Sequence, residues 1–209
     1  AINFFVVWFS SKYLGGEGRG YVSLFILNVS FIQIFNAVIG SSSIIYLQSR
    51  HPLSNIILLT VCWTIISSAI GAWSLGLTGG QQKINFSDTF FVAVFQSVLI
   101  NNSLLLLCRN QTVWYNVLRL IQPITLVVLL TFYFSLQQLT VQNYVEALVI
   151  SSFTGVLTSA ILILVKCNLR DVGSVKDTLY DFLKVGFLNQ FTNFVQLINY
   201  RFSFYLLAA

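Results

Sequence analysis

Long apolar stretches, separated by short polar turns, follow one another along nearly the whole chain. Of its 209 residues, 56% are hydrophobic and 8% are charged, whereas charged residues usually make up about 25% of a soluble domain. A stretch of about 20 apolar residues matches the roughly 30 Å hydrocarbon core of a bilayer. The sequence therefore predicts an integral membrane protein that crosses the bilayer several times.

The apolar stretches predict six membrane-spanning helices and the start of a seventh. The six run over 2–14, 21–47, 53–77, 89–108, 113–136 and 145–165, and the seventh starts near Val185. Strands of a membrane β-barrel would be about 10 residues long and would alternate polar with apolar positions. We therefore expect an all-α, polytopic transmembrane helix bundle with six spans plus a truncated seventh.

Charge and hydropathy divide the chain into three expected segments. Residues 1–165 form an N-terminal transmembrane lobe, whose first helix is truncated because 13 residues cover only about 20 Å. Residues 166–184 alternate charged and apolar positions, as an amphipathic linker on the cytoplasmic membrane surface would. Residues 185–209 begin a seventh apolar stretch and end inside an apolar run. We therefore expect the protein to continue beyond this chain.

The basic residues of the turns predict the orientation in the membrane. With the N-terminus inside, seven basic residues face the cytoplasm and three face outside, and short cytoplasmic loops are enriched in Lys and Arg. The inner set is Arg50, Arg109, Arg119, Lys166, Arg170, Lys176 and Lys184, and the outer set is Lys12, Arg19 and Lys83. A cytoplasmic N-terminus is therefore expected. The net charge of +5 suits a lipid surface, because the clustered basic patch of a nucleic-acid-binding protein is missing.

Groups that carry catalysis are scarce in the sequence. Catalysis needs a positioned nucleophile, base or metal. The one histidine, His51, lies in a turn and fits a plain interfacial residue, while Asp88, Glu146 and Asp181 lie at the ends of spans. The three cysteines show neither a CxxC pair nor a Cys/His spacing. We therefore expect no catalytic residue, no metal and no cofactor, and the chain is not predicted to be an enzyme.

Polar residues share one face of the seventh stretch. At 100° per residue, that face contains Asn189, Asn193, Gln196, Tyr200 and Ser203. Two interpretations remain: hydrogen bonds between helices, or the lining of a polar cavity, which the number of polar residues favours. Arg201 lies near this face. Because an arginine costs at least about 2.5 kcal/mol at the bilayer centre, it either faces water or an anionic ligand, or lies near an interface.

Two other stretches also carry polar or small faces. In the second stretch, Gln33 shares an arc with small residues and Asn36 lies just beyond it, so cavity lining and close packing are both open. In the sixth stretch, Ser151, Gly155 and Ser159 repeat every four residues, which is typical of a helix–helix packing face.

Two segments resemble a known family. The sequence KYLGGEGRGY at 12–21, with SSIIY at 42–46 near the end of the next span, is similar to the N-terminal signature of bacterial polysaccharide flippases, a basic residue followed by LGPEGRG. The sequence NYRFSFYLL at 199–207 is similar to their seventh helix. Gly16 stands where the family usually has proline, and Ser203 where many members have an acidic residue. The chain thus resembles the N-terminal half of an O-antigen or oligosaccharide flippase of the multidrug/oligosaccharidyl-lipid/polysaccharide (MOP) exporter superfamily.

The resemblance implies that an undecaprenyl-pyrophosphate-linked oligosaccharide, such as an O-antigen, capsule or exopolysaccharide repeat unit, is flipped across the bacterial inner membrane. Two six-helix lobes would alternate access around a cationic cavity, with 1–165 as the first lobe and 185–209 as the start of the second. The partners would be the lipid-linked substrate, membrane lipids, a coupling cation and the missing C-terminal half of the same chain. The residues that would line this cavity are Arg201, Asn189, Asn193, Gln196, Tyr200, Gln33, Asn36 and Lys12.

Three other functions remain as alternatives. A cation-coupled small-molecule exporter of the same superfamily would be favoured by an intramembrane carboxylate. A membrane enzyme of polysaccharide assembly would be favoured by a loop with clustered His, Asp or Arg. The sequence shows neither feature, which favours the flippase. A structural membrane protein without transport activity would tolerate Arg201→Ala and Gln196→Leu.

Overall fold

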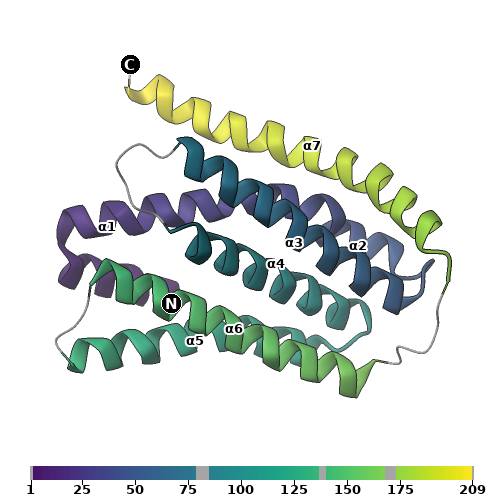
Figure 1. Ribbon diagram of the computed structural model, residues 1–209, viewed down its shortest axis with the longest axis horizontal. Coiled ribbons are helices and arrows are strands. Elements are labelled where there is room, and N and C mark those ends of the chain that lie inside the picture. The colour runs from purple at the N-terminus through teal and green to yellow at the C-terminus, as the bar shows by residue number, and fades with distance from the viewer. Residues whose placement is uncertain (1, 79–84, 137–139, 168–172, 209) are drawn as a thin grey trace.

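Long helices that run roughly lengthwise, with their turns gathered at two ends, build the chain in the computed structural model (Figure 1). It describes residues 2–78, 85–136, 140–167 and 173–208. Within these ranges there is no strand. The helices are α1 (Ile2–Asn36), the 3₁₀ turn η1 (Ala37–Ile39), α2 (Ser41–Leu47), α3 (Leu53–Thr78), α4 (Phe86–Cys108), α5 (Thr112–Ser135), α6 (Val141–Lys166) and α7 (Val175–Ala208). The predicted all-α class is confirmed.

Five helical segments of the described chain are long and apolar enough to cross a membrane. They are α3, α4, α5, α6 and the stretch from Lys12 to Leu47 that runs through α1 and α2. Their outward faces carry large apolar side chains such as Ile70, Trp73 and Leu164, as expected where a helix contacts lipid. These features support a multi-pass membrane protein.

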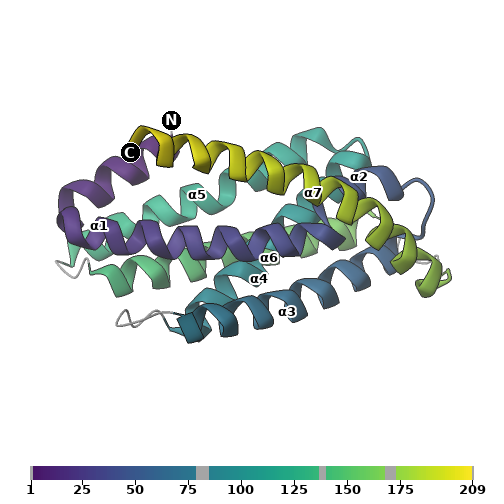
Figure 2. The ribbon, with the colours of Figure 1, turned by 90° about the horizontal axis from the view of Figure 1, so that it is seen from above.

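The start of the chain consists of two helical parts of α1 that meet at a kink in the predicted glycine-rich segment. The turn is shorter than the predicted 15–20, because Gly15 alone leaves the helical conformation, with φ 69° and ψ −179°. Figure 2 shows the resulting bend, at which the first part of α1 turns back. Because a positive φ is readily adopted by glycine, one residue is enough to end the first helical part and redirect the chain into the second.

The predicted second span, 21–47, is broken near its end. After η1, Gly40 adopts an extended conformation and α2 begins at Ser41. The side chain of Asn101 in α4 fills the space beside Gly40, where an added Cβ atom would meet its Oδ1 at 2.7 Å. Asn101 Oδ1 also accepts a hydrogen bond from the Ser41 N–H at 3.2 Å. The break is thus closed by a residue from another helix.

The last helix is continuous across the predicted boundary at 184/185. α7 runs from Val175 to Ala208, so residues 175–184 of the predicted linker share one helix with the predicted seventh span. Phe182 lies in this part of the predicted surface linker, but it is fully buried against the bundle. The first half of α7 therefore packs on protein, and it is not among the five segments apolar enough to span a membrane.

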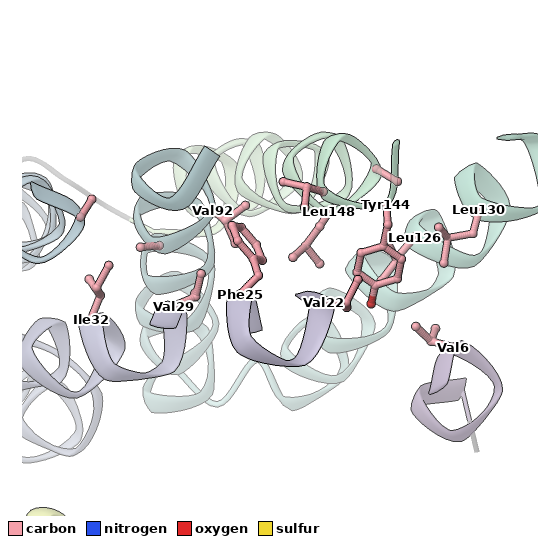
Figure 3. Packing of buried hydrophobic residues seen from close by; sticks show 14 residues of the cluster. Val6, Val22, Phe25, Val29, Ile32, Val92, Leu126, Leu130, Tyr144 and Leu148 are labelled. Carbon is pink, nitrogen blue, oxygen red and sulfur yellow. The ribbon is translucent and has the colours of Figure 1, made fainter. Parts of the chain in front are cut away.

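Two apolar clusters hold the helices together. In the first, Val22 and Phe25 of α1 point toward Val92 of α4 and toward Tyr144 and Leu148 of α6 (Figure 3). The second lies toward the opposite end of the helices, where η1, α2 and α7 meet α4. The repeat of small residues in α6 is confirmed as a packing face, because Ser151, Gly155 and Ser159 are buried. A Cβ atom on Gly155 would meet the side chain of Leu99 in α4 at 2.8 Å.

Candidate functional site

Arg119 is an exposed, charged residue of α5, a helix that is long and apolar enough to span a membrane. It lies seven residues after the start of α5, about 10 Å along the helix axis. Its Nη1 atom donates a hydrogen bond to the hydroxyl of Tyr115, one turn earlier, at 2.9 Å. Arg119 belongs to the predicted inner set of basic residues, and it lies within the predicted span 113–136 as well as within α5.

Two cavities meet at Arg119 and Gln122, and together we call them the Arg119 groove. One has a volume of about 370 Å³ and lies between α4 and α5. The other has a volume of about 420 Å³ and extends from α5 toward α1, α4 and α6. The polar residues of the groove are Gln96, Ser103, Tyr115, Arg119, Gln122 and Tyr144, and its apolar walls include Leu99, Leu104, Leu118, Leu126 and Leu148.

The amides of the groove are held by side chains of neighbouring helices. Gln122 Nε2 donates to Ser152 Oγ in α6 at 3.0 Å. Gln33 Nε2 in α1 donates to Gln96 Oε1 in α4, so the amide NH₂ of Gln96 remains a donor for a ligand. Each amide is therefore oriented while keeping hydrogen-bonding capacity toward the cavity.

Pro123 adds an acceptor to the same turn of α5. A proline has no N–H, so the helical hydrogen bond to the carbonyl four residues earlier, here that of Arg119, is not made. Pro123 itself lines the larger cavity. Arg119 thus places a charged donor, and Pro123 exposes a backbone acceptor, in one helical turn.

The groove suits an amphiphilic anion. Among the described residues that line it, Arg119 is the one charged side chain, so the groove carries positive charge without a carboxylate to neutralise it. A guanidinium forms strong, charge-assisted hydrogen bonds with phosphate oxygens. Amides and tyrosine hydroxyls bind hydroxyl groups, and the leucine walls can accommodate a hydrocarbon chain.

Asn36, predicted as a cavity residue, instead joins a buried polar cluster. Its Nδ2 atom donates to Ser68 Oγ at 3.0 Å and to Ser97 Oγ at 2.7 Å, and its Oδ1 atom accepts from Ser67 Oγ. Asn36 is 2% exposed and does not line either cavity of the groove. These bonds tie α1 to α3 and α4 next to the break, which is the interhelical role that amides often take in membranes.

The other predicted cavity residues are only partly placed by the structure. Gln33 reaches the groove through its bond to Gln96. Lys12 is exposed on α1, with its ammonium 5.3 Å from the ring of Tyr13. Asn189 is half-buried on α7. The side chains of Asn193, Gln196, Tyr200 and Arg201 lie outside the described residues, so the predicted polar face of α7 stays a prediction.

The groove was not among the predicted sites, although the sequence carries a signal for part of it. Tyr115, Arg119 and Gln122 are spaced by four and three residues, which places them on one face of a helix. The same 100° test that found the face at 189–203 would have found this one. The contributions of Gln96 and Tyr144 could not be found that way, because they come from other helices.

Comparison with known proteins yields no relative. No protein-family model, no curated protein and no solved structure matches the chain.

Proposed function

We propose that the chain belongs to a transporter that flips an undecaprenyl-pyrophosphate-linked oligosaccharide across the bacterial inner membrane. The observation that carries this proposal is the Arg119 groove, a positively charged and partly apolar groove that is open to the surface of the helix bundle. The likeness of 12–21 and 199–207 to polysaccharide flippases supports the same function. In this proposal the chain supplies the first six-helix lobe and the opening of the second, with its N-terminus in the cytoplasm.

Arg119 would bind the pyrophosphate, and the amides of Gln96 and Gln122 would bind sugar hydroxyls. A pyrophosphate offers several oxygens to one planar guanidinium, whereas a lysine would act as a point charge. The polar face of α7, with Asn189, Asn193, Gln196, Tyr200 and Arg201, would complete the cavity from the second lobe. A coupling cation would drive the change in access.

The charge of the groove favours this function over the alternatives. A cation-coupled small-molecule exporter would be favoured by an intramembrane carboxylate, and no Asp or Glu is found among the described residues that line the groove. An enzyme of polysaccharide assembly needs a positioned nucleophile or base, and the groove offers amides, a guanidinium and hydroxyls.

Complementation of a flippase-null strain tests the proposal. In the full-length protein, Arg119→Gln should abolish surface polysaccharide at unchanged protein level, and Arg119→Lys should restore part of it. Arg201→Ala should have the same effect as Arg119→Gln. Arg50→Gln is the matched control, because Arg50 packs on the ring of Tyr46 but lies in the turn after α2 and lines neither cavity of the groove. Wild-type complementation by Arg119→Gln would show that the groove does not carry transport.

A further inference from the structure

α7 docks on the broken helix through residues far apart in the sequence. Gln190 Nε2 donates a hydrogen bond to the backbone carbonyl of Ala37, in η1, at 3.1 Å. Gly186 lies so close to η1 that an added Cβ atom would overlap the carbonyl oxygen of Val38. The same atom would lie 3.3 Å from Ser43 Oγ in α2. The absence of a side chain at Gly186 is therefore what lets α7 approach the break.

The break is held from two sides. A broken membrane helix leaves backbone groups without their helical partners, and in a bilayer such groups must be satisfied by other parts of the protein. Asn101 of α4 accepts from the Ser41 N–H on one side of the break. Gln190 of α7 donates to the Ala37 carbonyl on the other. The geometry of the break thus depends on where α7 lies.

His51 fixes the start of α7 to the turn that follows α2. Its Nε2 atom lies 2.9 Å from Asp181 Oδ2, and its Nδ1 atom lies 3.1 Å from Thr178 Oγ1. Thr178 is buried and its hydroxyl also lies 2.8 Å from the Ser174 carbonyl. Both ring nitrogens of His51 therefore face α7, although the sequence suggests a plain interfacial residue.

Two features of the docked arrangement are energetically unfavourable. Ser43 Oγ is buried beneath α7 and has no hydrogen-bond partner, and a buried hydroxyl without a partner loses the hydrogen bonds it made to water. Ser41 has a φ of 44°, a left-handed conformation that is strained for a residue with a side chain. Both would be relieved if α7 moved away and the break rearranged.

We propose that the break between α1 and α2 is a hinge and that α7 is its lock. Gln190, Gly186 and the His51–Asp181 pair hold the hinge in the observed geometry, and release of α7 lets the hinge rearrange and exposes Ser43. The lock couples the position of α7 to the shape of the helix opposite. It goes beyond the proposed function, because it depends on helix packing and not on the molecule that is transported.

Labelling of a cysteine at Ser43 tests the lock. In full-length protein in its membrane, with Cys62, Cys108 and Cys167 changed to alanine, Ser43→Cys should react slowly with a membrane-permeant maleimide. Gln190→Leu and Asp181→Asn should each raise that rate about tenfold, the factor that corresponds to about 1.4 kcal/mol. Asp177→Asn is the matched control, because it removes a charge from the exposed face one turn earlier and should leave the rate unchanged.

A second probe separates release of α7 from general loosening. Ser151→Cys lies in the buried packing face of α6, away from α7, and its labelling rate should be the same in all variants. Unchanged labelling of Ser43→Cys in both Gln190→Leu and Asp181→Asn would overturn the lock. An equal increase at Ser43→Cys and Ser151→Cys would overturn it as well. Because cysteine labelling needs no transported ligand, its result can be interpreted even if the transport assay fails. Failure of the lock and failure of the proposed function can therefore be distinguished.

Discussion

Among single residues, Gly15 determines the position of the bend in α1. Its φ of 69° and ψ of −179° lie in a region that is essentially restricted to glycine, where a side chain costs roughly 1–3 kcal/mol. Gly15→Ala should therefore lower the thermal stability of the protein in detergent by about that free energy. Gly20→Ala is the control, because Gly20 has open space around its Cβ position and a φ outside that region. It should be neutral or slightly stabilising, since alanine favours helix. Equal stability of both variants would contradict the kink as a site of strain.

Asn36 tests whether a buried amide serves packing or transport. Asn36→Ala removes hydrogen bonds to Ser67, Ser68 and Ser97, at an average of about 0.6 kcal/mol each in a membrane protein. We expect a loss of roughly 1–2 kcal/mol in the free energy of unfolding, measured by titration with denaturing detergent, with transport retained. Ser30→Ala, which removes an exposed bond to its own helix, should have little effect. Loss of transport without loss of stability would contradict the packing role and would indicate that Asn36 contributes to transport.

At the scale of elements, hydropathy predicts where helices run but not where they break. The span 21–47 is apolar throughout, and its break depends on Asn101, 60 residues away. The course of α7 likewise depends on contacts of Gly186 with η1. The packing face of α6 was predictable because Ser151, Gly155 and Ser159 carry it within one helix. Features encoded within one helix, such as the packing face of α6, were therefore predictable from local sequence patterns. Features that depend on contacts between helices, such as the break before α2 and the course of α7, were not.

The close approach of α7 to η1 predicts an intolerant glycine. Gly186→Ala would force α7 away from the Val38 carbonyl, and overpacking of this kind typically costs about 1–3 kcal/mol. We expect a lower melting temperature in detergent. The paired control is Gly76→Ala in α3, where nothing lies within 4 Å of the Cβ position. A Gly186→Ala variant as stable as Gly76→Ala would show that α7 does not dock as described.

In the whole molecule, the turns between helices lie at two opposite ends of the bundle. The turn between α2 and α3 and the turn between α4 and α5 lie at one end, and α4 begins at the other (Figure 1). Ser49→Cys and Ser87→Cys place exposed thiols at these two ends. With the N-terminus inside, an impermeant maleimide added to intact cells should label Ser87→Cys, and should label Ser49→Cys only after permeabilisation. Labelling of both from one side would contradict the arrangement of spans, and the reverse pattern would contradict the orientation alone.

Movement of a lipid-linked oligosaccharide across the membrane of reconstituted vesicles tests whether the Arg119 groove is needed for transport. Full-length protein would be placed in liposomes containing a pyrophosphate-linked oligosaccharide lipid, and the fraction of sugar exposed outside would be followed over time. We predict faster movement than in protein-free liposomes, a loss of roughly tenfold or more in Arg119→Gln, as expected for hydrogen bonds to a charged group, and no loss in Arg50→Gln. Movement no faster than in protein-free liposomes, or equal movement by Arg119→Gln and the wild type, would contradict the account.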